Sequence, residues 1–290
     1  MMMEYEILNR IEKQLNKKIV SQKPISGGCI SDSSIIQTSS GEKYFLKINN
    51  HVPSDMFVKE ANGLKEIEKT NSIRVPSVKL AKDNFILMEC IEASSKTKSF
   101  FKDFGIEFAK MHKYNGSCFG FYEDNYIGST IQINIPTEDE KHDWKNFYFN
   151  KRLLFQFKLA EKKGYVDFGL RKCFNQLETK IDKILDTDLE KPVLLHGDLW
   201  AGNYIVDENG RACLIDPAVY YGNREADLAM TKLFGGFTKE FYYSYDEFYP
   251  LNDGYDYREN IYKLYHVLNH LNLFGSGYYQ QALALIKFYL

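Results

Sequence analysis

The sequence predicts an α+β fold of two lobes, a small β-rich lobe over residues 1–91 and a larger, mainly helical lobe over residues 92–290. Strand-like runs rich in β-branched and aromatic residues gather in the first third of the chain. Helical spacing of apolar residues dominates the remainder, apart from one β-rich island at residues 192–216. With 290 residues, 44% of them hydrophobic, the chain can bury the cores of two lobes that share one cleft.

The first lobe is expected to begin with a helix and continue as a sheet. In the first helix apolar residues recur at steps of four, and the two hairpin strands are joined by Ser-Ser-Gly. A glycine turn at residues 26–28 separates helix and hairpin. The expected elements are a helix at 4–17, a hairpin at 33–38 and 42–49, a helix across the sheet at 56–69, and two strands, VPSVKLA and NFILMEC.

The second lobe follows a short polar connector, EASSKTKS (92–99). Helical spacing predicts helices in FFKDFGIEFAKMHKY, DWKNFYFNKRLLFQFKLAEKK and RKCFNQLETKIDKILD. In the island, PVLLHGD precedes a loop, and YIVD and ACLID flank Glu-Asn-Gly-Arg. Asn209-Gly210 is among the strongest short signals for a β-hairpin, so the island should contain one.

Composition excludes several classes of function. Thirty-seven Lys and Arg against 39 Asp and Glu give a formal charge of −2, which argues against attraction to nucleic acid or anionic lipid. The five cysteines form no C-x-x-C pair, which suggests neither a disulfide framework nor a thiolate zinc site. The first residues lack the apolar core of a signal peptide, and no 18 apolar residues run together. We therefore expect a cytoplasmic protein that neither spans a membrane nor binds nucleic acid.

The island contains the run HGDLWAGN, and Asp216 follows its last residue, Asn203, after twelve intervening residues. Phosphoryl transfer from ATP needs a carboxylate that accepts a proton from the attacking hydroxyl, and oxygen ligands for Mg²⁺ across the phosphates. Asp198 on a tight loop, Asn203 five residues later and Asp216 after a hairpin strand could converge on one point.

Asp198 and Asn203 could also be turn residues that bond to their own backbone. However, H-x-D, four residues, Asn, twelve residues and Asp reproduce the order of the catalytic loop and the metal-binding Asp of protein kinases. A glycine turn and a strand lysine stand upstream in the matching order. The pattern therefore favours an ATP-dependent kinase of the protein-kinase-like fold, with Asp198 as base and Asn203 and Asp216 as ligands of Mg²⁺.

The ATP-binding residues are expected in the first lobe. Lys47 lies in a predicted strand, where it needs a partner such as phosphate, and Glu60 in the next helix is the candidate carboxylate, although it could also be a solvated helix residue. Backbone N–H groups at Gly27, Gly28 and Cys29 could approach phosphates closely. Adenine would bond to main-chain groups of the segment Glu89-Cys90-Ile91 at the end of the last strand of this lobe.

Three further residue types have two readings. Trp200 could form an apolar wall of the substrate site or pack between the loop and the large lobe. His266 and His270 are spaced to bind zinc on a helix, but packing or capping is the better reading because a third ligand is missing. Cys29 could be a reactive thiol beside the phosphates, so we expect a monomer or a redox-linked dimer through Cys29, unless its thiol is tucked under the turn.

Six segments of the chain together resemble one family of kinases. They are SGGCIS (26–31), FLKIN (45–49), LLHGDLWAGN (194–203), IDPAVYYGNREADLAM (215–230), FGGF (234–237) and LNHLNLFG (268–275). The family that they resemble is the fructosamine-3-kinase, or ketosamine-3-kinase, family, a branch of the aminoglycoside-phosphotransferase-like kinases, and the resemblance covers nearly the whole chain.

The resemblance implies a function and a set of roles. ATP would phosphorylate the third hydroxyl of a fructosamine or ribulosamine, on a small molecule or a protein, and the phosphorylated adduct would then fall apart and free the amine. It also implies the roles given above for Asp198, Asn203, Asp216, the Lys47–Glu60 pair and the adenine segment. The segment FGFYEDNYIGSTIQIN (119–134) resembles bacterial members, and its Asn125 and Tyr126 are candidates for contact with substrate.

One departure from protein kinases is informative, and two rival functions stay open. Asp216 is followed by Pro217 instead of Phe-Gly, and no A-P-E motif follows, so we expect no phosphorylation-driven loop switch. A kinase for another small hydroxyl substrate, such as an aminoglycoside, choline or methylthioribose, would share the same fold and ATP chemistry. A silent binding or scaffold protein on this fold would usually have lost the lysine, the base or the metal-binding Asp, all of which are present.

Overall fold

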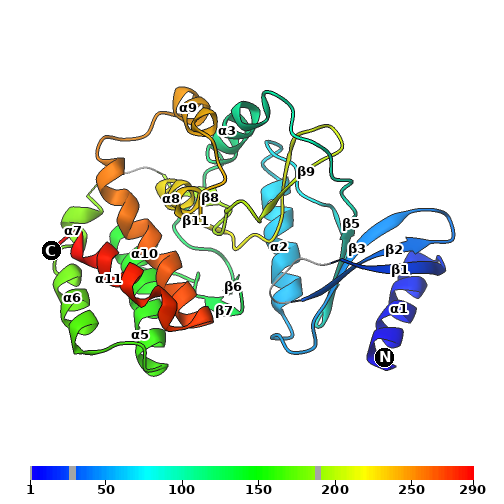
Figure 1. The fold of residues 1–290 in the computed structure, drawn as a ribbon, viewed down its shortest axis with the longest axis horizontal. Helices are drawn as coiled ribbons and strands as arrows, with labels where there is room; N and C mark the ends of the chain where they lie inside the picture. Colours follow the sequence, from blue (N-terminus) through cyan, green and yellow to red (C-terminus); the bar gives the residue numbers. More distant parts are fainter. Residues whose placement is uncertain (1, 26–30, 187–190) are drawn as a thin grey trace.

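The structure, a computed structural model, describes residues 2–25, 31–186 and 191–290, and a β-rich part lies beside a larger helical part (Figure 1). The β-rich part holds one five-stranded sheet in the order β1-β2-β3-β5-β4, with every neighbouring pair antiparallel. Its elements are α1 (Met2–Leu15), β1 (Ile19–Ile25), β2 (Asp32–Thr38), β3 (Lys43–Ile48), α2 (Met56–Glu68), β4 (Val78–Lys82) and β5 (Phe85–Glu89).

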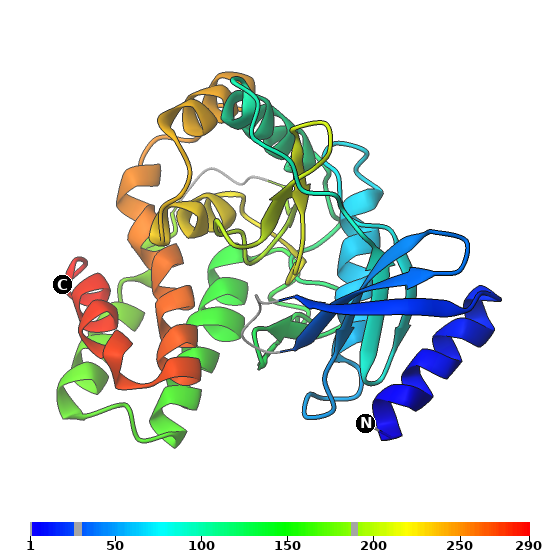
Figure 2. The same ribbon diagram turned by 45° about the vertical axis from the view of Figure 1, so that its right-hand side comes forward.

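Helices cover this sheet on both faces (Figure 2). Ile7 and Ile11 of α1 pack in one buried cluster with Leu46 of β3. On the other face, α2 contributes Phe57 and Leu64 to the main core of the molecule. Because successive side chains of a strand point to opposite faces, Leu46 faces α1 and the next residue, Lys47, faces α2.

Residues 90–99 connect β5 to the helical part and contain no helix or strand. The lobe boundary predicted at residue 91 falls within this segment and stays a prediction. The helices of the second part are α3 (Phe100–Met111), α4 (Trp144–Tyr148), the π-helix η1 (Phe149–Leu154), α5 (Phe155–Lys162), α6 (Phe168–Glu178), α7 (Ile181–Ile184), α8 (Glu225–Leu233), α9 (Lys239–Phe248), α10 (Tyr255–Phe274), the 3₁₀ turn η2 (Ser276–Tyr278) and α11 (Tyr279–Lys287).

Three small antiparallel pairs are set into the helical part. The pair of β9 (Tyr204–Val206) and β10 (Ala212–Leu214) is the hairpin that Asn209-Gly210 predicts, and Gly210 has a φ of 72° there. Two pairs were not expected from the sequence. They are β6 (Asn125–Ile127) with β7 (Thr130–Gln132), and β8 (Val193–Leu195) with β11 (Tyr220–Gly222). Strands of three residues carry too little periodicity to stand out from a loop.

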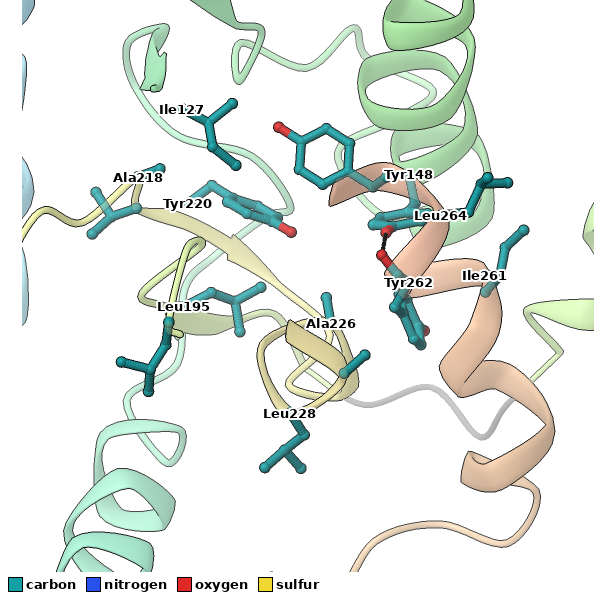
Figure 3. Close-up of a cluster of buried hydrophobic side chains, with 14 of the residues drawn as sticks. Ile127, Tyr148, Leu195, Ala218, Tyr220, Ala226, Leu228, Ile261, Tyr262 and Leu264 are labelled. Atoms are coloured by element: carbon teal, nitrogen blue, oxygen red, sulfur yellow. Dashed lines mark hydrogen bonds between the residues drawn. The ribbon is translucent and has the colours of Figure 1, made fainter. Parts of the chain in front are cut away.

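The pairing of β8 with β11 matters most for the site, because it fixes the two ends of the segment that holds the predicted catalytic residues. Leu195 pairs with Tyr220. Both side chains are buried, with residues of α8 and α10 such as Leu228 and Leu264 packed in the same cluster (Figure 3). The loop after β8 therefore rests on a rigid apolar support.

The helix predicted at 143–163 forms as α4, the π-helical turn η1 and α5 in succession, and Arg152 of η1 is fully buried in the core. Arg152 donates to the Ile133 carbonyl at 2.6 Å and to Asn134 at 2.7 Å, and its guanidinium lies 3.9 Å from the centroid of the Tyr220 ring. No described helix is both long and apolar enough to cross a bilayer.

Candidate active site

The loop after β8 is held by Asp227, a buried residue of α8. The backbone N–H groups of His196 and Gly197 donate to its two carboxylate oxygens at 2.6 and 2.8 Å. Gly197 has a φ of 82°, and a Cβ at this position would lie 2.0 Å from the Ala218 carbonyl oxygen. Only glycine fits this turn, so the spacing of the HGD motif has a steric cause.

Asp227 is itself kept ionised by its neighbours. His112 lies 3.2 Å from it and also bonds to the Tyr245 hydroxyl at 2.7 Å. Although burial opposes the shift, hydrogen bonds from His112 and from Gly197 hold the pKa of Asp227 below its ordinary value. No role for Asp227 was expected from the sequence; the available signal was an acidic residue between the apolar residues Ala226 and Leu228.

Asp198 follows this turn, and its side chain is only 19% exposed. The Asn203 amide donates to the Asp198 carbonyl oxygen at 2.8 Å and to its carboxylate at 3.3 Å. Burial, together with the charges of Asp216 and Asp227, raises the pKa of Asp198 well above its ordinary value. A higher pKa makes this carboxylate a better proton acceptor while it remains ionised.

Asp216 follows β10 and lies beside Asn203, since the Ile215 N–H donates to the Asn203 carbonyl at 3.0 Å. Its φ of 54° is in the left-handed region, an unusual conformation for a non-glycine residue and one that is enriched at functional sites. The Asp216 side chain is 43% exposed. The backbone thus holds a carboxylate in a partly exposed position at a local energetic cost.

The side chains of Asn203 and Asp216 fit a magnesium ion. The Asn203 amide nitrogen is occupied by Asp198, and no described residue donates to its oxygen Oδ1. Asp216 offers carboxylate oxygens beside it. One amide and one carboxylate oxygen suit Mg²⁺ bound mainly by phosphate oxygens and water, and no denser cluster of acidic, His or Cys ligands occurs among the described residues.

Lys47 joins the sheet to this site. Its ammonium group lies 2.8 Å from Glu60 of α2 and also contacts Asp216. Burial alone would lower the pKa of Lys47, but the charges of Asp216 and Glu60 outweigh it and raise the pKa above the ordinary value. The predicted pair is therefore formed, and the lysine is charged at neutral pH.

The end of β5 is anchored through the Glu89 side chain. Arg74 donates to Glu89 at 2.6 Å, and the Ser77 N–H donates to the same carboxylate at 3.1 Å. The carboxylate is therefore already bonded to Arg74 and Ser77, which is compatible with adenine contacts through the main chain alone. Cys90 and Ile91, the next residues, are half-buried, and burial raises the pKa of the Cys90 thiol.

Trp200 begins a strip of aromatic rings beside the catalytic loop. We call this set the aromatic strip: Trp200, Phe234, His270, Phe274 and Tyr278. Neighbouring ring centroids are 4.9 to 6.3 Å apart, and Trp200 is 40% exposed. A Cβ at Gly202 would lie 2.4 Å from the Trp200 ring, so a glycine two residues later lets the indole fold over its own loop.

The structure does not support substrate contact by Asn125. The side chain is 5% exposed, donates to the Val219 carbonyl at 2.8 Å and accepts from Gln132 and Asn134. These hydrogen bonds hold the Asn125 side chain inside the core, where it supports the segment that follows Asp216. Tyr126 donates to Asp55 at 2.7 Å and so links the helical part to the start of α2.

Gly27, Gly28 and Cys29 lie outside the described residues, so the predicted phosphate contacts and the redox link through Cys29 stay predictions. The two histidines of α10 form no zinc site with any third described ligand. His270 donates from Nδ1 to the carbonyl of His266 at 2.8 Å, which agrees with packing and local backbone bonding.

The chain matches the family model for fructosamine kinases over residues 3–290. It is 40% identical over 280 residues to a chloroplastic protein-ribulosamine 3-kinase of Oryza sativa, covering 94% of this chain and 80% of that protein. It is 37% identical over 278 residues to a candidate ketoamine kinase of Enterococcus faecium, covering 94% and 96%.

Solved structures agree with these relatives. A candidate fructosamine-3-kinase from Haemophilus somnus superimposes with a TM-score of 0.86 at 30% identity, covering 98% of this chain and 96% of that one. An ADP-bound aminoglycoside phosphotransferase superimposes with a TM-score of 0.60 at 17% identity, covering 98% and 99%. The second similarity shows the shared fold, which is the two-lobed kinase-like fold that the sequence predicts.

Proposed function

The chain belongs to the fructosamine kinase family, and we propose that it transfers the γ-phosphoryl group of ATP to the 3-hydroxyl of a ketosamine, either a fructosamine or a ribulosamine. One observation carries the proposal beyond the family. Asp198, Asp216 and the Lys47–Glu60 pair come from distant segments, yet Lys47 contacts both Glu60 and Asp216, and the charge of Asp216 acts on Asp198, a grouping that would suit ATP-dependent phosphotransfer.

Each polar group has a defined task in this reaction. Lys47, oriented by Glu60, would hold phosphate oxygens of ATP. Asn203 and Asp216 would hold Mg²⁺, which supplies positive charge to the phosphates when it is bound. Asp198 would accept the proton of the attacking hydroxyl, and Asp227 keeps the Asp198 loop in place through two backbone N–H groups.

The substrate would enter from the side of the loop that carries Trp200. The exposed indole offers an apolar face for the sugar, and the other rings of the aromatic strip extend this apolar surface from Trp200. We propose that the strip contacts the amine-bearing end of the ketosamine, on a small molecule or on a protein. The 3-phosphorylated product would then release the free amine, so the enzyme would reverse glycation.

The cellular setting is part of the proposal. The described cysteines are Cys90, Cys118, Cys173 and Cys213, and all are free thiols. Free thiols persist in reducing compartments, which supports the expectation that the protein works in the cytoplasm.

Substrate profiling tests the proposed function. ATP consumption would be measured with purified enzyme and Mg²⁺ on a fructosamine, a ribulosamine, an aminoglycoside, choline and methylthioribose. We expect turnover on one or both ketosamines, with little on the other three. Preference for an aminoglycoside or choline would show a different kinase on the same fold, and no ATP consumption on any substrate would favour a binding protein.

A further inference from the structure

His266 of α10 presents a buried nitrogen to the catalytic base. The residue is 3% exposed, and its ring nitrogen Nδ1 is buried with no hydrogen-bond partner among the described residues. Nδ1 lies 4.0 Å from Oδ1 of Asp198. A buried polar atom without a hydrogen-bond partner is energetically costly and rare in proteins, so we expect an atom of a bound ligand to pair with this nitrogen.

The surrounding polar groups are engaged elsewhere. Tyr265 donates to Gln132 at 2.7 Å, and the Nδ1 of His270 is bonded to the backbone of α10. Arg152, behind these residues, bonds to a carbonyl and to Asn134. Within the described part of the chain, no neighbour is therefore left to satisfy His266.

The separation of the two groups suits a ligand between them. At 4.0 Å, Nδ1 and Oδ1 are too far apart for a direct hydrogen bond. For an oxygen atom about 2.8 Å from both, the angle Nδ1–O–Oδ1 would be roughly 90°. One hydroxyl group, or two neighbouring hydroxyls, can adopt this geometry. The ring is neutral, because burial lowers the pKa of His266 to about 3.

The proton of this neutral ring belongs on Nδ1. A lone pair on Nδ1 would face the carboxylate of Asp198, whereas an N–H there is attracted by it. His266 thus presents an N–H donor near Asp198, the residue that would accept the proton of the reacting hydroxyl. An N–H bonded to the reacting oxygen itself would withdraw electron density from the nucleophile and weaken its attack, so the neighbouring hydroxyl is the better acceptor.

We propose that His266 donates a hydrogen bond from Nδ1 to the 4-hydroxyl of the ketosamine, next to the 3-hydroxyl that Asp198 deprotonates. This inference rests on the proposed function. Both fructosamine and ribulosamine carry this hydroxyl. The enzyme then recognises a pair of neighbouring hydroxyls through one carboxylate and one imidazole, and a substrate without the second hydroxyl leaves the buried N–H unsatisfied.

The test combines two substrates with two variants. The substrates are a fructosamine of a simple amine and its 4-deoxy analogue. With the wild-type enzyme, kcat/KM should be roughly ten- to a hundredfold lower for the 4-deoxy analogue. His266→Leu should lose about the same factor on the complete substrate and should no longer distinguish the two substrates. The KM for ATP should stay unchanged.

His266→Asn is the matched control, because its amide can place an N–H near the position of Nδ1. It should recover most of the activity and most of the discrimination. Thermal unfolding and ATP binding of both variants would be measured alongside, and the wild-type comparison of the two substrates does not depend on any variant folding.

The outcomes separate the two proposals. Equal wild-type turnover of both substrates would overturn the role of His266 while leaving the proposed function intact. The role of His266 would also be overturned, with the proposed function intact, if His266→Leu distinguished the two substrates as strongly as the wild type does, since His266 would then be a packing residue. A wild-type enzyme that phosphorylates neither ketosamine would overturn the proposed function, and this inference with it.

Discussion

Asp198 is partly buried and lies near two other carboxylates. Both features make it a stronger proton acceptor. Burial and the charges of Asp216 and Asp227 raise its pKa, and the Asn203 amide partly offsets them. Asp216, in contrast, is well exposed and is held in a left-handed backbone conformation. The two carboxylates therefore suit different tasks, one proton transfer and the other metal binding.

Replacing the base should affect turnover more than nucleotide binding. Asp198→Asn keeps the size of the side chain but cannot accept the hydroxyl proton, so kcat should fall by roughly 10² or more. ATP affinity, measured by calorimetry, should stay near the wild-type value because Asp198 would not touch ATP. A folded variant with near-normal turnover would remove Asp198 from this role.

Replacing the proposed metal ligand should have a different signature. Asp216→Ala removes a carboxylate that also contacts Lys47, so Mg-ATP binding and turnover should both weaken. The measurement is kcat and the apparent affinity for ATP across a magnesium titration. If the magnesium curves of the variant and the wild type coincide, Asp216 is not a metal ligand.

At the scale of elements, the catalytic loop depends on one helix. α8 delivers Asp227 under the turn at Gly197, and the pairing of β8 with β11 holds the ends of the segment. The same helix is tied to α10 by the buried ion pair of Glu225 with Arg258, at 2.6 Å. Because α10 also carries His266, these contacts fix the positions of Asp198 and His266 relative to each other.

Asp227→Asn tests this support. The amide can accept only one of the two backbone N–H groups, so the variant should lose about 1–3 kcal/mol of unfolding free energy and roughly tenfold in kcat. Amide hydrogen exchange at His196 and Gly197 should become faster. Asp246→Asn is the control, since Asp246 accepts the Leu251 N–H in an exposed position and its loss should change kcat little. Equal effects of both changes would contradict the role of Asp227.

At the scale of the whole molecule, Arg74 links the sheet to the catalytic hairpin. It bonds to Glu89 at the end of β5 and to Asp207 and Glu208 between β9 and β10, at 2.6 to 2.7 Å. Asp207 is buried. The five-stranded sheet and the β9–β10 hairpin are therefore joined by a charged network as well as by the chain itself.

Removing this link should weaken both stability and nucleotide binding. Arg74→Ala leaves the buried Asp207 without its cation, so unfolding free energy should fall by about 1–3 kcal/mol and the KM for ATP should rise severalfold. Thermal unfolding and ATP kinetics measure the two effects. Arg171→Ala, which removes an exposed ion pair with Glu161, is the control and should change the KM for ATP little. An unchanged KM for ATP in Arg74→Ala would limit the network to stability.

The sequence by itself determined the fold class and the two-part order of strands and helices, and it singled out the polar residues that we propose carry out the chemistry. Long periodic segments and local spacing carry this information, because the period of a helix and the turn chemistry of Gly197 and Asn209-Gly210 act over a few residues. The pairing of Lys47 with Glu60 could also be predicted, since a strand lysine needs a partner and the next helix offers one.

Only the tertiary structure decided what lies behind and beside these groups. The support from Asp227, the burial of Asn125, the short strands β8 and β11, and the approach of His266 to Asp198 each join residues that are far apart in the chain. No local pattern encodes such contacts, because they arise when separate helices pack around a common core. Burial then decides whether a polar residue faces substrate or supports the backbone, as the contrast between Asp198 and Asn125 shows.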